Sequence, residues 1–151
     1  MTQPMTQPMK RGAAGTMNNR MTTERAQTRV LVVDDEEIIH RLLREGLHRH
    51  GVEDVLFARD GVEALEVMEG AGTGVDAVIL DHRMPRMDGL TAAGHIKERW
   101  PGADIIFFTA DLEAAERARE MGLFEVLVKP VSLQVIFNSI KEALAAKPGE
   151  T

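Results

Sequence analysis

The sequence contains no cysteine, which excludes disulfide bonds and thiolate-metal sites and fits a reducing compartment. No apolar run approaches the length of a membrane span, and the N-terminus lacks the apolar core of a secretory signal. We therefore expect a soluble, cytoplasmic protein that does not associate with membranes. The 151 residues, of which 44% are hydrophobic, predict one domain with a single sizeable core.

Acidic residues outnumber basic residues after position 29. Residues 1–29 contain five basic residues and one acidic residue, a balance of +4; because the net charge is −6, residues 30–151 must carry −10. Such an acidic body argues against a nucleic-acid partner. Residues 1–28 are rich in Thr, Gln, Asn, Gly and Met and repeat the run Met-Thr-Gln-Pro, so we predict a disordered N-terminal tail.

Short apolar runs alternate with amphipathic stretches from Val30 onward. The runs contain little alternation of polar and apolar residues, which is typical of strands buried on both faces. Five strands alternating with five helices predict an α/β fold, flavodoxin-like, in which a doubly wound parallel (βα)5 sheet has the strand order 2-1-3-4-5. The expected strands are 30–34, 53–58, 76–81, 104–109 and 124–128.

Four of these strands end in polar or small residues. The carboxyl ends of parallel strands meet at one edge of a sheet, where ligands bind near the switch point of the strand order. We therefore expect the side chains at these four ends to lie close together. They are Asp34 and Asp35 after the first strand, Asp81 after the third, Thr109 and Ala110 after the fourth, and Lys129 and Pro130 after the fifth.

Three carboxylates at one edge repel one another and require a cation. Hard carboxylate oxygens favour Mg²⁺, and Lys129 adds a second positive charge. A metal-bound carboxylate can attack phosphorus and form an acyl phosphate, with the transition-state oxygens held by cations and donors. Asp81 is the best nucleophile because it ends the central strand and enters an open loop. Any one of these aspartates alone would be interpreted more simply as a helix cap or turn residue.

In the same scheme, Asp34 and Asp35 lead directly into a helix and are better suited to binding the metal. The hydroxyl of Thr109 can donate a hydrogen bond to a phosphoryl oxygen. Ala110 is small and leaves room for the incoming group. The strand ends therefore predict a site that carries a phosphoryl group on Asp81.

Four ordered motifs resemble the receiver domain of two-component response regulators. The resemblance covers about residues 29–146 and leaves residues 147–151 as a short C-terminal tail. The motifs are Val32-Val33-Asp34-Asp35-Glu36, Asp81-His82-Arg83-Met84-Pro85-Arg86-Met87-Asp88-Gly89, Phe108-Thr109-Ala110 and Val128-Lys129-Pro130.

The resemblance implies that Asp81 accepts phosphate from a histidine kinase or a histidine phosphotransfer protein. It also implies that Asp35, Asp81 and the backbone carbonyl of Arg83 contact Mg²⁺ (or Mn²⁺), with Asp34 acting through water. Thr109 and Lys129 would bind the phosphoryl group. The Lys129-Pro130 bond would be cis, which is tolerable only before proline.

Two features depart from the common pattern of this family. The position that usually holds an aromatic switch residue holds Val126; Phe124, two residues earlier, would share a strand face with it. We expect the output face of the fourth helix, fifth strand and fifth helix to respond in an unusual way. At the positions that tune phosphate lifetime, Arg83 and Asp111 are predicted to form an ion pair that slows attack by water, although two solvated charges would contribute little.

Three functions remain open on the sequence. The first is a stand-alone phosphorylated switch that signals by protein binding or phosphorelay, as a monomer or as a homodimer. It is expected because few residues follow the domain. The second is an adaptor that retains the fold and signals without phosphorylation, which Val126 slightly favours. The third is a phosphohydrolase with an aspartate nucleophile; that class places the nucleophile after the first strand, whereas Asp81 follows the third.

Overall fold

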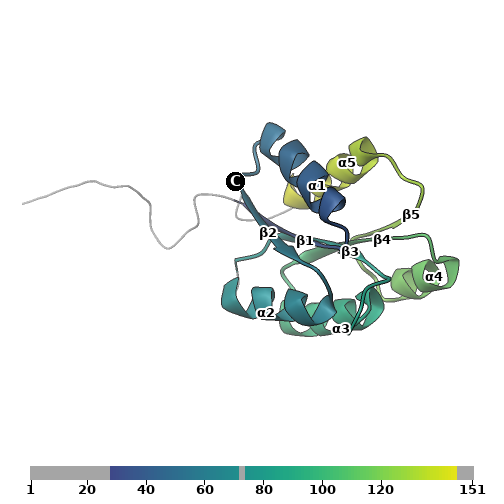
Figure 1. The fold of residues 1–151 in the computed structure, drawn as a ribbon. Coiled ribbons are helices and arrows are strands. Elements are labelled where there is room, and N and C mark those ends of the chain that lie inside the picture. Colours follow the sequence, from purple (N-terminus) through teal and green to yellow (C-terminus); the bar gives the residue numbers. More distant parts are fainter. Residues whose placement is uncertain (1–27, 72–73, 146–151) are drawn as a thin grey trace, which may run out of the picture.

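The computed structural model describes residues 28–71 and 74–145, which form one five-stranded sheet and five helices (Figure 1). All strand pairs are parallel, and the order is β2-β1-β3-β4-β5. The predicted flavodoxin-like (βα)5 fold is therefore confirmed. The strands are β1 (Arg29–Val33), β2 (Asp54–Ala58), β3 (Ala77–Asp81), β4 (Asp104–Thr109) and β5 (Glu125–Val128). The helices are α1 (Glu37–Arg49), α2 (Gly61–Ala71), α3 (Gly89–Arg99), α4 (Leu112–Glu120) and α5 (Leu133–Ala145).

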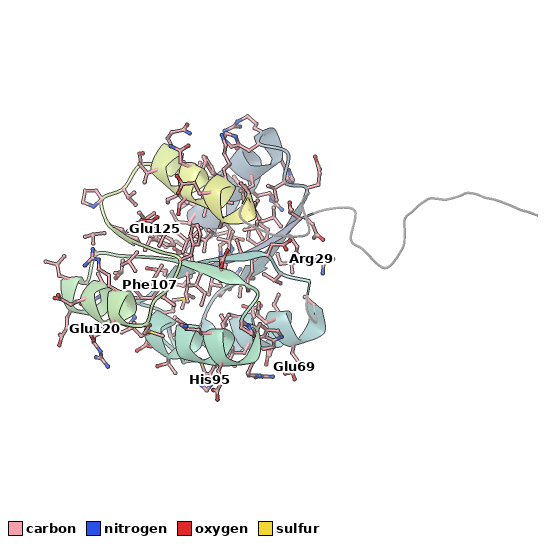
Figure 2. The ribbon with its side chains drawn as sticks, turned by 180° about the vertical axis from the view of Figure 1, so that it is seen from behind. Arg29, Glu69, His95, Phe107, Glu120 and Glu125 are labelled. Atoms are coloured by element: carbon pink, nitrogen blue, oxygen red, sulfur yellow. The ribbon has the colours of Figure 1, made fainter. Side chains whose placement is uncertain are left out.

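The helices cover both faces of the sheet. Helices α1 and α5 lie on one face and α2, α3 and α4 on the other (Figure 1), and each layer encloses its own apolar cluster. Phe107 of β4 is fully buried in the cluster on the side of α2, α3 and α4 (Figure 2). Burial on both faces explains why the strands lack alternating polarity. All five residues of β3 are buried, because this strand lies between β1 and β4.

The order of the strands fixes where the polar strand ends meet. β1 pairs with β2 on one side and with β3 on the other, so the chain changes direction along the sheet between β1 and β3. Asp34 follows β1 by one residue, rather than ending the strand as predicted, and Asp81 is the last residue of β3. Both therefore lie at the carboxyl edge of the sheet at its switch point, where α/β folds bind ligands.

The fifth strand begins later than predicted. Gly122 has a φ of 74° and turns the chain after α4, and the ladder with β4 begins with Glu125 opposite Ile106. Phe124 lies before the strand and is 37% exposed. The prediction that Phe124 shares a strand face with Val126 is therefore wrong.

Two predictions about the chain ends stay predictions. Except for Thr28, the tail predicted for residues 1–28 lies outside the described residues, as does the short tail of residues 147–151. Within residues 28–71 and 74–145, no helix is both long and apolar enough to span a bilayer.

Candidate functional site

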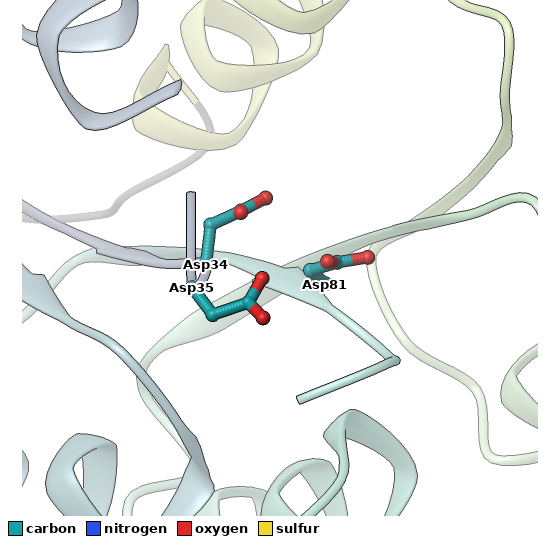
Figure 3. A group of neighbouring side chains, drawn as sticks. All are labelled: Asp34, Asp35 and Asp81. Atoms are coloured by element: carbon teal, nitrogen blue, oxygen red, sulfur yellow. The ribbon is translucent and has the colours of Figure 1, made fainter. Parts of the chain in front are cut away.

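Three carboxylates gather at the carboxyl ends of β1 and β3 (Figure 3). Asp34 and Asp35 follow β1, Asp81 ends β3, and one carboxylate oxygen from each lies within 4.8 Å of the others. The side chain of Asp35 is exposed, whereas Asp34 and Asp81 are buried. The convergence predicted from the strand ends is present, and it concentrates negative charge where little water can screen it.

Asp34 retains a buried oxygen without a partner. Its Oδ1 accepts a hydrogen bond from the Glu36 amide at 2.8 Å, while Oδ2 is buried and accepts none from the described residues. Burial raises the pKa of Asp34 to about 7; the Glu36 amide opposes this shift and the charge of Asp81 adds to it. An unpartnered carboxylate oxygen beside two more carboxylates fits a hard cation with bound water, because Mg²⁺ prefers oxygen ligands and retains several waters.

Asp81 is connected to β5 through Lys129. Asp81 Oδ1 accepts a hydrogen bond from the His82 amide at 2.8 Å and lies 3.4 Å from Lys129 Nζ. Burial raises the pKa of the Asp81 carboxyl, and the charge of Lys129 opposes that rise without cancelling it. The ammonium of Lys129 also lies 4.7 Å from the centre of the Phe108 ring, which restricts where the long side chain can move.

Thr109 and Ala110 complete the edge of the site at the end of β4. The Thr109 hydroxyl oxygen accepts a hydrogen bond from the Asp111 amide at 3.0 Å, which leaves its hydrogen free to be donated. Thr109 is buried and Ala110 is exposed. The Lys129-Pro130 peptide bond is cis, as the resemblance implied. A largely apolar groove of about 480 Å³ begins at Ala110, Lys129 and Pro130 and continues between α1 and α5.

The ion pair predicted across the mouth of the site is also present. Arg83 Nη2 lies 3.3 Å from Asp111 Oδ2, with the Arg83 side chain 78% exposed. The second oxygen of Asp111 caps α4 by accepting a hydrogen bond from the Ala114 amide at 3.0 Å, a role not predicted from the sequence. The Ala114 amide, with a further contribution from Arg83, lowers the pKa of Asp111, so this carboxylate stays charged. Its effect on phosphate lifetime stays a prediction.

Three side chains near the site were not selected from the sequence. His40 Nε2 lies 2.6 Å from the backbone oxygen of Asp34. Asp60, after β2, accepts two hydrogen bonds from Arg86 in the loop that follows Asp81. No local pattern marks these pairs, because their partners lie 6 and 26 residues away along the chain.

A sequence model of the family described as "response regulator receiver domain" matches residues 30–141. The chain belongs to this family. Receiver domains are signalling domains rather than classical enzymes, and they interact with histidine kinases or phosphotransfer proteins. The family, together with a nucleophile candidate that follows the third strand, leaves the phosphohydrolase interpretation without support.

Similar proteins agree with this assignment. The chain is 40% identical over 119 residues to the transcriptional regulatory protein PdtaR of Mycobacterium tuberculosis, covering 78% of this chain and 57% of PdtaR. It is 33% identical over 121 residues to the chemotaxis protein CheY of Treponema pallidum, covering 79% of this chain and 84% of CheY. The chain thus spans about half the length of PdtaR and most of CheY.

A solved structure with a bound Mg²⁺-BeF complex resembles the whole domain. The response regulator protein TrrA from Thermotoga maritima, in complex with Mg²⁺-BeF, superposes with a TM-score of 0.69 at 33% identity, covering 78% of this chain and 99% of TrrA. That protein was therefore crystallised with the type of ion that the cluster of Asp34, Asp35 and Asp81 fits.

Proposed function

We propose that this protein is a phosphorylated signalling switch that accepts a phosphoryl group on Asp81. The donor is a histidine kinase or a histidine phosphotransfer protein, and the signal is passed on by protein binding or by phosphorelay. The observation that carries the proposal is the meeting of three carboxylates within 4.8 Å with Lys129 Nζ 3.4 Å from Asp81. A merely structural cluster would pair its buried carboxylates, whereas Asp34 retains an unpartnered oxygen.

We extend the proposal to the metal ligands that the family resemblance implies. Asp35, Asp81 and the backbone carbonyl of Arg83 would hold Mg²⁺ (or Mn²⁺), and Asp34 would bind it through water. When bound, the cation neutralises the carboxylates and stabilises negative charge on the phosphoryl oxygens. Without a cation, the carboxylates repel one another, and Asp34 and Asp81 have raised pKa values.

The chain's own residues then account for the transfer step. Asp81 Oδ1 is engaged by Lys129 and the His82 amide, so we assign the attack on phosphorus to Oδ2. The new bond joins this oxygen to phosphorus as the bond from phosphorus to the donor breaks, and the donor leaves with the electron pair. Lys129 Nζ moves to a phosphoryl oxygen, and the free hydroxyl hydrogen of Thr109 is donated to another.

The groove beside the site suits the approach of the protein donor. It is lined by Ile39 and Leu43 from α1, by Val131 before α5 and by Leu133 at the start of α5, and it reaches the site through Lys129. Ile38 on α1 and Val135 on α5 add exposed apolar surface, at 49% and 42% exposure. A helix that carries a phosphohistidine would cover these apolar side chains while it reaches Asp81. We also propose that the protein is cytoplasmic, in the same compartment as the phosphorylated domain of the donor.

The output partner is assigned to the face formed by α4, β5 and α5. Leu112 at the start of α4 is 69% exposed and follows Asp111, which pairs with Arg83 beside Asp81. Val126 is half-buried against the cluster beneath α4, so no large ring can rotate inward at this position. On phosphorylation, we expect this face to rearrange less than it would with an aromatic residue at position 126. Homodimerisation through this face is the alternative output. Structures with and without a phosphoryl mimic test this, and a large shift of α4 would contradict it.

Intact mass spectrometry tests the phosphorylation directly. The protein is incubated with acetyl phosphate in the presence of Mg²⁺, in the presence of a chelator, and as the Asp81→Asn variant. We expect the mass of one added phosphoryl group in the wild type with Mg²⁺ only. An unmodified wild type would instead support the adaptor that signals without phosphorylation. Continuous release of phosphate without a modified protein would revive the hydrolase interpretation.

A further inference from the structure

The loop after Asp81 contains a strained turn at Arg86. The Met87 amide donates to the Pro85 carbonyl at 2.6 Å, which closes a three-residue turn, and Arg86 at its centre has a φ of 66°. A γ-turn with positive φ at its centre is the rare and strained form. Arg86 is the one non-glycine residue with positive φ among the described residues. Strain of this kind persists only where surrounding contacts hold it in place.

Asp60 supplies that contact. Arg86 Nε lies 2.9 Å from Asp60 Oδ2, and Arg86 Nη2 lies 3.2 Å from Asp60 Oδ1, a two-pronged pair. Asp60 is 6% exposed, and its Oδ1 also accepts the Glu63 amide at 2.8 Å in the first turn of α2. The carboxylate is therefore hydrogen-bonded both to the first turn of α2 and to Arg86 in the Asp81 loop. These hydrogen bonds outweigh the effect of burial and lower the pKa of Asp60, so the pair is charged at neutral pH.

The backbone closes the same junction. The Gly61 amide donates to the Met87 carbonyl at 3.0 Å, and a side chain added at Gly61 would meet Met87 Cγ at 2.7 Å. The start of α2 and the Asp81 loop are thus in direct contact at Arg86 and at Met87, the residue after it. Three residues before Arg86 is Arg83, whose carbonyl is assigned to the metal.

We propose that Arg86 is a positioning residue which, held by Asp60, fixes the Asp81 loop so that the Arg83 carbonyl faces the metal. The inference rests on the proposed function, because it concerns the same Mg²⁺ site. Neither residue belongs to the groups proposed to hold the metal or the phosphoryl group. Their role is to hold the loop in the bound conformation beforehand, so that Mg²⁺ does not have to order it.

Electrostatic attraction and loop positioning predict opposite changes in Mg²⁺ affinity when Arg86 is replaced. Removing the positive charge of Arg86 would by Coulomb attraction alone tighten Mg²⁺ binding, and removing the negative charge of Asp60 would weaken it. If the pair positions the loop, both changes weaken Mg²⁺ binding. The double variant should then bind no more weakly than the single Arg86 variant, because one interaction is lost in each case.

Calorimetric titration with Mg²⁺ separates these outcomes. Arg86→Gly retains an easy positive φ and loses the grip on Asp60, so its thermal unfolding should change little while the dissociation constant for Mg²⁺ rises about tenfold. Asp60→Asn should raise the dissociation constant for Mg²⁺ less, since an amide oxygen still accepts hydrogen bonds. Arg86→Lys retains the positive charge but cannot form both hydrogen bonds to Asp60 as the guanidinium does, so it should also weaken Mg²⁺ binding. If Arg86→Gly or Arg86→Lys binds Mg²⁺ as tightly as the wild type, or more tightly, the proposal is overturned.

A matched control and a second readout distinguish positioning from general destabilisation. Arg99→Gln removes another arginine–carboxylate pair, with Glu69, which joins α3 to α2, and should leave Mg²⁺ affinity unchanged. Saturating Mg²⁺ should return Arg86→Gly to the wild-type rate of phosphorylation by acetyl phosphate; a rate that stays low contradicts a role through the metal. If the wild type itself binds no Mg²⁺, the proposed function fails together with this inference. Normal binding by the wild type together with normal binding by either Arg86 variant overturns the inference alone.

Discussion

The two edges of the sheet hold their charged side chains in opposite ways. At the amino edge, Arg29 Nε lies 2.6 Å from Asp54 Oδ2, and the Arg29 amide donates to Asp76 (Arg29 is labelled in Figure 2). At the carboxyl edge, Asp34 is more deeply buried than either partner of that pair and retains an oxygen without a hydrogen bond. A buried unpaired charge costs folding free energy. Charge at the amino edge is thus paired within the fold, whereas the unpaired oxygen of Asp34 at the carboxyl edge fits the cation proposed above.

The largest expected effect concerns Asp34 in the metal-free protein. Its pKa is raised from 3.8 to about 7, so the folded state binds this proton more tightly than the unfolded state. Folding stability should therefore fall as pH rises from about 4 to about 7, by at most about 1.4 kcal/mol per pH unit from this group. Asp34→Asn cannot titrate and should lose less stability over that range.

Urea unfolding in the presence of a chelator measures this difference. The wild type should become less stable relative to Asp34→Asn as pH rises from about 5 to about 7. Added Mg²⁺ should restore stability to the wild type at neutral pH and do much less for the variant, because binding to the folded state stabilises it. Parallel pH profiles for the two proteins would show that Asp34 titrates normally.

A smaller effect is expected at the amino edge. Asp54→Asn removes the partner of Arg29, a half-exposed pair, and should lower the free energy of unfolding by about 1 kcal/mol. Mg²⁺ affinity and phosphoryl gain should stay at wild-type levels, since Asp54 lies at the far end of β2 from the site. If Asp54→Asn impaired phosphorylation while it remained folded, the separation of the two edges would be incorrect.

The smallest effect is expected for the exposed pair at the mouth of the site. Arg83→Asn removes the ion pair with Asp111, and the half-life of the phosphorylated protein should shorten by less than about fivefold, because exposed pairs contribute little. Loss of phosphate is timed after the donor is removed. Arg99→Asn, another exposed arginine paired with a carboxylate, is the control and should leave the half-life unchanged. An unchanged lifetime in Arg83→Asn would mean that the pair is only structural.

The sheet and the site could be predicted because their signals are local. Uniformly apolar runs that end in Asp34, Asp81 and Lys129 specify buried parallel strands, and the strand order then brings those ends together. The strand boundaries differ from the predictions by one residue or less. At Phe124, a turn through Gly122 overrides a strand propensity, and the apolar character of the residue alone could not show that.

Contacts between distant loops could not be predicted in the same way. The pairing of Arg86 with Asp60 depends on a backbone conformation that disfavours any residue but glycine or asparagine, and the sequence shows only an arginine between Pro85 and Met87. The burial of the unpartnered Asp34 oxygen likewise depends on the packing around the end of β1. Such features arise from packing, so they appear only in three dimensions.

One measurement compares both edges and tests the central claim most directly. Wild type, Asp81→Asn and Asp54→Asn are each incubated with acetyl phosphate and Mg²⁺, and their intact masses are recorded. The account predicts one added phosphoryl group on the wild type and on Asp54→Asn, and none on Asp81→Asn. An unmodified wild type, or an Asp81→Asn variant that gains the group as readily as the wild type, would contradict the assignment of Asp81 as the phosphoacceptor.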